Sequence, residues 1–348
     1  MRVLIIGAFD FKKMDIGGQL VKTRELYNLL KKQSYFEFVD YLETFKWKKR
    51  FVFKFFELLA KTRKNDIIIM LPAQNGVNVF SKLLLLFKKK KTRVYYYVIG
   101  GWLPEILINN NKLSNRLMKF NGIWVETTNM CNSLKSIKFN NVYVIPNFKN
   151  IKPLKVNDMI TKYEAPYKLC TFSRVMVEKG IEDAINAIKK INSDNNKVIL
   201  TLDIYGAIDE NYLKSFNLLM KSFPKYIQYK GIINPSESIN TIKNYFLLLF
   251  PTHYYTEGIP GTIIDSYASG VPIITSLWKN YNDVFMNGIT GYGYSFDDKE
   301  GLINAILNAI NDVENVVNMK KNCLKYSEKF TTEAVEKEIK DLLMNGDN

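Results

Sequence analysis

Residues 249–276 read LFPTHYYTEGIPGTIIDSYASGVPIITS and decide how the second half of the chain folds. The apolar run from Tyr245 to Phe250 predicts a strand that is buried on both faces. Pro260 suits the first turn of a helix, and Gly270 followed by Pro272 ends that helix. The stretch therefore predicts a strand, a loop, a helix and a second strand.

The start of this predicted helix suits an anion. The backbone N–H groups of Gly261 and Thr262 should have no partner inside the helix, and with the helix dipole they favour a phosphate. Glu257 in the loop and Asp265 one turn into the helix can accept hydrogen bonds from neutral hydroxyls. We interpret the stretch as a site for a sugar joined to a phosphate. The alternative is a helix start with incidental acidic residues.

Composition indicates a large globular protein. The chain has 348 residues, of which 47% are hydrophobic and only 10 are Pro, so it can hold two domains. Its three cysteines are widely spaced, which fits a reducing cytosol and predicts neither a disulfide framework nor a zinc site. Neither a cleavable signal nor an apolar run of about 18 residues is expected, so we predict a cytoplasmic protein.

Charge is unevenly distributed along the chain. Residues 1–165 hold 30 Lys and Arg against 12 Asp and Glu, a net +18, whereas residues 166–348 hold 19 against 22, a net −3. This asymmetry indicates that the first domain faces something anionic. A Lys-rich genome is the alternative, and it explains the total charge better than its distribution.

Strand and helix patterns alternate throughout, which predicts two doubly wound parallel α/β domains. In residues 1–150 we expect strands at 2–6, 35–41, 66–70, 93–99, 123–126 and 142–145, with helices such as 18–32 and 77–91. Residues 151–166 are predicted to be a linker. In residues 167–330 we expect strands at 167–172, 198–204, 226–230, 245–250 and 271–275, and helices that begin near 178, 209, 236 and 261.

Three helical segments close the chain, at 298–313, 316–330 and 332–344. We expect the last, about residues 331–348, to pack back on the first domain. Ligands of doubly wound sheets bind beyond the carboxyl ends of the strands. Two such domains facing each other would therefore form one deep cleft.

A basic turn follows the first strand of the second domain. Residues 173–180 read SRVMVEKG, which places Arg174 and Lys179 at the carboxyl edge of the sheet. At about 4 Å and an effective dielectric near 20, each charge pair is worth roughly 4 kcal/mol before desolvation, enough to help hold a diphosphate. The alternative is a solvated basic turn.

Glycines mark further turns at the ligand-binding edges. Gly17 and Gly18 precede a helix of the first domain, where the backbone can approach a phosphate. Gly206, and Gly231 with Ile232, follow strands of the second domain, with ordinary turns as the alternative.

Two kinds of chemistry lack support in the sequence. His253 is the only histidine, so neither a His-based triad nor a multi-His metal site can form, and we predict a hydrogen-bonding role beside the acidic loop. Residues 7–10 read GAFD instead of G-x-G-x-x-G, so a nicotinamide or flavin cofactor is not expected.

A mixed aromatic and basic segment suggests a membrane contact. Residues 45–56 read FKWKKRFVFKFF and continue into a basic helix that ends near Lys64, and a second cluster spans Lys88 to Lys91. Such segments are typical of binding to anionic bilayers. The alternative is a helix whose apolar side is core. Nucleic acid is not the expected partner, because no recognised binding module accompanies the charge.

Together these motifs resemble glycosyltransferase family 4, the retaining GT-B group of the glycosyl transferases group 1. The resemblance rests on Arg174 with Lys179, on EGIPGT at 257–262, on Asp265, and on ASGVP at 268–272. It is specific over about residues 168–280 and looser in the first domain, where Gly17-Gly18 and VIPN at 144–147 fit.

The resemblance implies a GT-B fold, with two Rossmann-like domains facing across a cleft. It implies sugar transfer from a UDP- or GDP-linked donor to an acceptor hydroxyl, with retained configuration and neither metal nor other cofactor. Arg174, Lys179 and Glu257 would be catalytic, the cations binding the diphosphate and Glu257 the donor sugar. With the glycine turns above, the donor-binding residues are Gly17, Gly18, Gly206, Ile232, Gly258, Ile259, Pro260, Gly261, Thr262 and, at the ribose, Asp265.

The chain departs from the family pattern at two places. Asp265 stands where the family usually has Glu, and it is shorter by one C–C bond of about 1.5 Å, so a closer helix or a water would be needed. Many relatives carry a His after the fourth strand of the first domain, where this chain has Gly100-Gly101-Trp102. We expect Trp102 to offer a stacking face to an acceptor sugar.

The expected acceptor is a glycan or lipid-linked glycan of cell-surface polysaccharide biosynthesis, with a peripheral contact at the inner face of the cytoplasmic membrane. Two alternatives stay open: a nucleotide-sugar epimerase of GT-B-like fold, and a catalytically silent, membrane-associated partner of a polysaccharide assembly complex. The scarcity of histidine and the second-domain motif argue against the first. Intact Arg174, Lys179 and Glu257 argue against the second.

Overall fold

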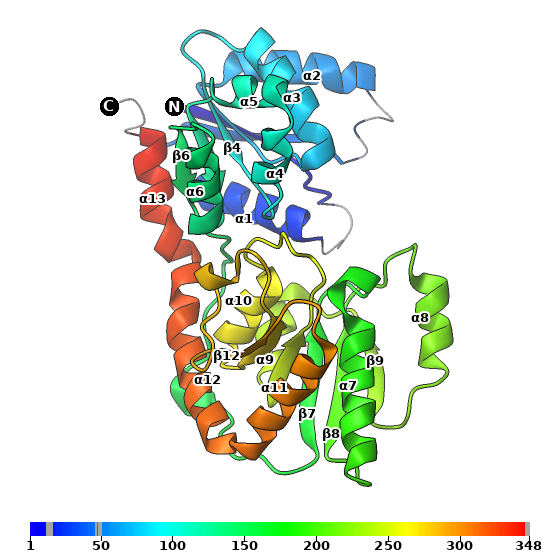
Figure 1. Ribbon diagram of the computed structural model, residues 1–348. Coiled ribbons are helices and arrows are strands. Elements are labelled where there is room, and N and C mark those ends of the chain that lie inside the picture. Colours follow the sequence, from blue (N-terminus) through cyan, green and yellow to red (C-terminus); the bar gives the residue numbers. More distant parts are fainter. Residues whose placement is uncertain (12–16, 46, 48–50, 345–348) are drawn as a thin grey trace. The chain divides into compact units, whose positions relative to one another are not determined.

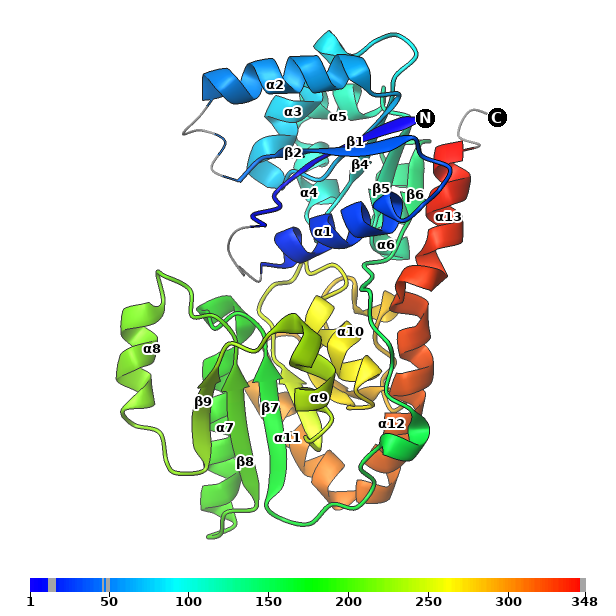
Figure 2. The ribbon, with the colours of Figure 1, turned by 180° about the vertical axis from the view of Figure 1, so that it is seen from behind.

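The chain forms two compact units, each built on a six-stranded parallel sheet (Figures 1 and 2). The computed structural model describes residues 1–11, 17–45, 47 and 51–344. Unit 1 comprises Met1–Asn150 and Phe330–Asn348, and unit 2 comprises Ile151–Lys329. Helices cover both faces of each sheet, so the predicted doubly wound α/β architecture is confirmed.

The sheet of unit 1 has the order β2-β1-β3-β4-β5-β6. All its strands pair in parallel, and their central residues are Ile-, Val- and Tyr-rich because both faces of the sheet are buried. The strands are β1 (Arg2–Gly7), β2 (Phe38–Glu43), β3 (Ile67–Met70), β4 (Arg93–Tyr97), β5 (Gly122–Val125) and β6 (Val142–Val144).

Helices from both ends of the chain cover one face of this sheet. They are α1 (Gly18–Lys31) and α13 (Thr332–Met344), whose residues Val335, Ile339 and Leu343 are buried in the same cluster as α1. The opposite face carries α2 (Phe51–Lys64), α3 (Gln74–Phe87), α4 (Leu103–Ile108), α5 (Asn111–Leu117) and α6 (Thr128–Ser136). Among the described residues, no helix has both the length and the apolar character needed to cross a bilayer.

The sheet of unit 2 has the order β12-β11-β10-β7-β8-β9. Its strands are β7 (Tyr167–Phe172), β8 (Leu200–Tyr205), β9 (Ile227–Gly231), β10 (Leu247–Phe250), β11 (Ile273–Ser276) and β12 (Gly291–Tyr294). One apolar cluster contains residues of α7 (Ile181–Asp194), α8 (Leu213–Met220) and α11 (Lys299–Asn311). The opposite face carries α9 (Ser238–Ile242) and α10 (Gly261–Ala268), and α12 (Val313–Ser327) packs on α10 (Figure 2).

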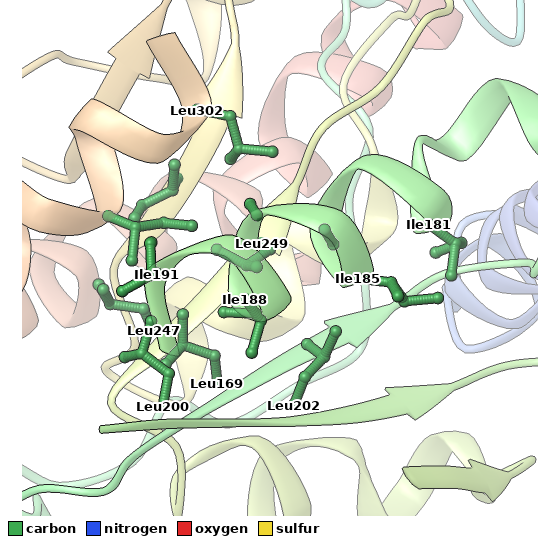
Figure 3. Packing of buried hydrophobic residues seen from close by; sticks show 14 of the residues in the cluster. Leu169, Ile181, Ile185, Ile188, Ile191, Leu200, Leu202, Leu247, Leu249 and Leu302 are labelled. Carbon is green, nitrogen blue, oxygen red and sulfur yellow. The ribbon is translucent and has the colours of Figure 1, made fainter. Parts of the chain in front are cut away.

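The core of unit 2 forms where α7 lies on the central strands. Ile181, Ile185 and Ile188 repeat at helical spacing and are fully or almost fully buried. They lie in one apolar cluster with Leu169 of β7 and Leu202 of β8 (Figure 3). This packing fixes α7, and with it the turn that joins β7 to α7.

Several predicted boundaries were wrong. β2 begins at Phe38 because the backbone turns at residues 33–36, and α7 begins at Ile181 because a short 3-10 turn, η3 (Val177–Lys179), precedes it. α8 begins at Leu213 and not near 209. β12 was not predicted. Residues 151–166, the predicted linker, are part of unit 2, where the N–H of Leu154 donates to the carbonyl of Ala268 at 2.8 Å.

Candidate functional site

The loops after β7 and β10 meet at the switch point of the sheet in unit 2. From β7 the strands proceed outward to β8 and β9, and from β10 they proceed in the other direction to β11 and β12. Helices leave the two central strands on opposite faces, so a crevice outside their carboxyl ends is the usual ligand site of such sheets. The two loops carry Arg174, Lys179 and Glu257.

Lys179 and Glu257 form a direct ion pair between these loops. The Lys179 ammonium contacts Oε1 of Glu257, and each side chain is 16% exposed. Thr252 donates to the same carboxylate oxygen at 3.3 Å, and Asn280 donates from Nδ2 to the backbone carbonyl of Glu257 at 2.7 Å. The acidic loop is therefore held at both its side chain and its backbone.

A glycine allows the two loops to approach so closely. Gly180 has a φ of +64°, and a Cβ at this position would lie 1.8 Å from the carbonyl oxygen of Pro251. Next to this contact, the N–H of His253 donates to the carbonyl of Glu178 at 2.8 Å. Only glycine fits at position 180 without displacing the loop that leads to Glu257.

Helix α10 begins at the same edge of the sheet. Among the described residues, no backbone carbonyl accepts a hydrogen bond from the N–H groups of Gly261 or Thr262. The Thr262 hydroxyl donates to the carbonyl of Phe172, the last residue of β7, at 2.5 Å. The helix start therefore presents two N–H groups beside the ion-paired loops, where an anion is favoured.

Arg174 lies on the turn directly after β7 and pairs with Asp209, with Nη1 and Oδ2 3.7 Å apart. Its side chain is 48% exposed, so this contact leaves much of the guanidinium accessible. Gly206, which follows the neighbouring strand β8, lies close against this turn. Its φ is +134°, and a Cβ there would lie 1.8 Å from the carbonyl oxygen of Ser173, so the close approach requires glycine.

Tyr254 lies close to the charged groups of the site. Its ring centroid lies 5.0 Å from the Lys179 ammonium. Burial raises the pKa of the Tyr254 phenol, Glu178 and Glu257 raise it further, and Arg174 opposes them. Arg174, Lys179 and Glu257 therefore all act on this one side chain.

His253 anchors the acidic loop from its other side. Its Nε2 lies 2.8 Å from Oδ2 of Asp183 on α7, and its Nδ1 lies 2.5 Å from Oδ1 of Asp297. The imidazole therefore bridges two carboxylates, one on α7 and one just after β12. It holds the start of the loop that carries Glu257.

Other predicted donor-binding residues flank this centre. Gly258, Ile259 and Pro260 lead from Glu257 to α10, and Asp265 inside α10 is only 4% exposed. Ile232 follows β9 and is 58% exposed. Their contacts with a ligand stay predictions.

The predicted residues of unit 1 lie at the starts of helices. Gly17 precedes α1 and Gly18 begins it, with open space where a Cβ at Gly18 would be. Trp102 precedes α4, and its indole N–H donates to the carbonyl of Ile99 at 2.8 Å while the ring packs on the core. Their roles toward donor and acceptor also stay predictions.

Four residues of the site were not predicted. Thr252 and Tyr254 lie between β10 and Glu257, so their position at the carboxyl edge was a usable signal. Asn280 and Asp209 are distant in sequence from the loops they contact and carry no local signal. Within the described residues, no group of three or more His, Cys, Asp or Glu is placed to hold a metal ion.

Part of the chain is similar in sequence to known proteins. Residues 157–327 match the family model of the glycosyl transferases group 1. The matched segment lies within unit 2. A segment of 143 residues is 30% identical to CapM of Staphylococcus aureus, a capsular polysaccharide biosynthesis glycosyltransferase, and covers 40% of this chain. The match spans only about a third of that relative, 35% of its length.

Solved glycosyltransferase structures resemble the whole chain. Sucrose-phosphate synthase from Thermosynechococcus elongatus is 16% identical with a TM-score of 0.79, covering 99% of this chain and 98% of that one. HepE from Anabaena, solved with UDP and glucose, is 14% identical with a TM-score of 0.75, covering 99% and 100%. Unit 2, which contains the matched segment, thus corresponds to the second half of a GT-B fold, and the predicted fold class is confirmed.

Proposed function

We propose that the chain is a retaining glycosyltransferase of cell-surface polysaccharide biosynthesis. It would move a sugar from a UDP- or GDP-linked donor to a hydroxyl of a glycan or lipid-linked glycan, without a metal. The observation that carries this proposal is the Lys179–Glu257 ion pair beside the start of α10, where the N–H groups of Gly261 and Thr262 have no backbone acceptor among the described residues. CapM is named as a glycosyltransferase, and HepE was solved with UDP and glucose. Both relatives support sugar transfer from a nucleotide-linked donor.

The ion pair explains how one site recognises both parts of the donor. Lys179 attracts the diphosphate, assisted by Arg174 and by the N–H groups of Gly261 and Thr262. Glu257 accepts hydrogen bonds from hydroxyls of the sugar. Because the two side chains touch, the groups they bind must be adjacent, as a sugar and its diphosphate are.

Transfer then requires stabilisation of the leaving group. The bond between the anomeric carbon and the diphosphate oxygen breaks, and its electron pair goes to the diphosphate. The acceptor oxygen bonds to the anomeric carbon from the same face, and its proton passes to the departing phosphate oxygen. Preorganised cations and N–H groups contribute most where negative charge develops, which here is the diphosphate.

Unit 1 would complete the reaction site. In this proposal Gly17 and Gly18 approach the diphosphate through their backbone, Asp265 binds the ribose and Trp102 stacks on an acceptor sugar.

The first experiment identifies the donor and then tests the ion pair. A panel of UDP- and GDP-sugars is screened for thermal stabilisation, and nucleotide release is measured with the stabilising donor. Lys179→Ala and Glu257→Ala are each expected to lower kcat by about 100-fold or more, because each removes a preorganised charged group. Lys190→Ala is the matched control, since Lys190 pairs with Asp194 at 3.2 Å on the exposed side of α7.

The outcomes separate transfer from its alternatives. Mass spectrometry of the products distinguishes a glycosylated acceptor from an epimerised donor, and a chelator should leave turnover unchanged. Parent-like activity of both site variants would refute the assigned roles. A protein that binds no nucleotide sugar would refute the proposal itself.

A further inference from the structure

Helix α2 of unit 1 has a strongly exposed apolar stripe. Phe53 is 82% exposed, Phe56 is 64% exposed and Val52 is 61% exposed. Their spacing puts them along one side of the helix. Large apolar side chains gathered at the surface mark an interaction site, whereas single ones are ordinary.

This stripe is separate from the side of α2 that packs on unit 1. Leu58 is fully buried, and the ring of Phe55 lies 5.8 Å from that of Phe87 on α3. Trp47, just before the helix, packs its ring 4.9 Å from that of Phe80. The interpretation as a helix with an apolar core side therefore applies to only part of the aromatic segment. Phe55 and Trp47 contribute to packing, and Phe53 and Phe56 point outward.

Exposed cations flank the stripe. Glu57, the single acid of α2, pairs with Lys54 at 2.7 Å and with Lys61 at 3.3 Å. Arg63 and Lys64 at the end of the helix remain exposed.

A second group of cations lies near the beginning of α2. Lys89, Lys90 and Lys91 are exposed and follow Phe87, whose ring contact with Phe55 brings the end of α3 beside the first turns of α2. The cations Lys48, Lys49 and Arg50, which the sequence also offers, lie outside the described residues.

We propose that the α2 face docks unit 1 on an anionic bilayer. Val52, Phe53 and Phe56 would enter the boundary between headgroups and acyl chains, and the flanking cations would contact lipid phosphates. Charge complementarity selects this partner. The acid Glu57 is paired with Lys54 and Lys61, whereas Arg63, Lys64 and Lys89 to Lys91 are exposed near the two ends of the helix. Residues 1–165, which contain the stripe, carry a net charge of +18 from 30 basic and 12 acidic residues.

The proposal concerns one surface of unit 1 and stands whether or not the chain transfers a sugar. The test is co-sedimentation of the full chain with vesicles of neutral lipid and of neutral lipid mixed with phosphatidylglycerol. We compare the parent with Phe53→Gln/Phe56→Gln and with Arg63→Gln/Lys64→Gln. Gln is a good helix former, so neither pair should unfold the exposed side of α2.

A matched control comes from α8 of unit 2. Leu218 there is 66% exposed and Lys214 is exposed, so Lys214→Gln/Leu218→Gln removes the same kinds of side chain elsewhere. Thermal unfolding of every variant verifies that its fold is retained.

The parent should bind anionic vesicles and bind neutral ones more weakly. Phe53→Gln/Phe56→Gln should weaken binding at least about tenfold. Arg63→Gln/Lys64→Gln should weaken binding to anionic vesicles about fivefold per cation and leave neutral vesicles unaffected. The α8 control should bind like the parent.

Three results would overturn the proposal. They are a parent that binds anionic vesicles no better than neutral ones, an aromatic variant that binds like the parent, and an α8 control as impaired as the α2 variants. Self-association of the parent without vesicles, abolished by Phe53→Gln/Phe56→Gln, would be a fourth such result, because it would identify the face as an interface between copies.

Discussion

At the scale of single residues, Gly180 controls how closely the two loops of the site approach. Its positive φ excludes most side chains, and a Cβ would overlap the carbonyl oxygen of Pro251. Any larger residue must push away the loop that carries Thr252 and Glu257. The backbone conformation of Gly180 thus affects where the carboxylate of Glu257 lies.

We expect Gly180→Ala to lower both stability and activity. Nucleotide release should fall about 100-fold, since a displacement of about 1 Å in a positioned group can cost that much. Gly288→Ala is the control, because Gly288 has a φ of +75° with open space around a Cβ. Gly288→Ala should lower the free energy of unfolding by only roughly 1–2 kcal/mol, the cost of a left-handed backbone conformation, and should leave turnover unchanged. Equal activity of the two variants would contradict this account.

The sequence predicted which site residues share a sheet edge, but not how they pair. Lys179 and Glu257 follow central strands, so their common location could be inferred from the βα pattern. The contact of Glu257 with Asn280 could not, since nothing local to Asn280 marks it. The same holds for Lys22 and Glu126 in unit 1, a buried pair with Nζ and Oε1 2.5 Å apart at positions that differ by 104 in the sequence.

At the scale of elements, the alternation of strands and helices was predicted well because buried parallel strands have a strong apolar signal. β12 is the informative exception. Its sequence, GYGY, has two glycines and no β-branched residue, so its propensity for a strand is low. Pairing with β11 from Ile273 to Ser276 makes it a strand. Tertiary context, which a single sequence does not display, decides such elements.

Helix α12 contains a buried cation, Lys320. Its ammonium donates to the carbonyl of Tyr245 at 3.5 Å and lies 5.2 Å from the centroid of the Tyr163 ring. Burial lowers the pKa of Lys320 from 10.5 to about 8, although Cys323 and Cys170 act in the opposite direction. The charged form is therefore disfavoured in the folded protein.

We expect Lys320→Met to stabilise unit 2 at neutral pH. Between pH values of about 8 and 10.5 the unfolded chain binds more protons at this site than the folded chain does. The free energy of unfolding of the parent therefore increases as the pH rises through this range. The advantage of the variant should be largest below pH 8, on the order of 3 kcal/mol, and should shrink toward pH 10.

Urea unfolding of parent and variant at several pH values measures this difference. Lys190→Met, at an exposed position of the same unit, is the control and should show no such pH dependence. An advantage of Lys320→Met that does not change with pH would show that packing, and not the buried charge, is responsible.

At the scale of the whole molecule, α13 is the last helix in the described part of the chain but belongs to unit 1. Tyr95 of β4 donates its hydroxyl hydrogen to the carbonyl of Leu342 at 3.1 Å, and Ile339 and Leu343 are buried. The core of unit 1 thus combines residues from both ends of the sequence.

We expect Ile339→Ala and Leu343→Ala each to destabilise unit 1 by about 2–5 kcal/mol, the usual cost of removing a buried aliphatic side chain. The exposed neighbour Lys337 provides the control Lys337→Ala, which should change stability by less than about 0.5 kcal/mol. Hydrogen exchange resolved by segment measures the effect. Loss of protection in β4 and α1 is expected, and unchanged protection there would contradict the packing role of α13.

This connectivity has a consequence during synthesis on the ribosome. Unit 2 is one uninterrupted segment, Ile151–Lys329, so it can fold as soon as it emerges. Unit 1 is made first but completes its core only after residues 332–344 have been translated. During synthesis, unit 2 can therefore fold before unit 1 is complete. Until α13 has emerged, the apolar residues that it covers in unit 1 stay exposed.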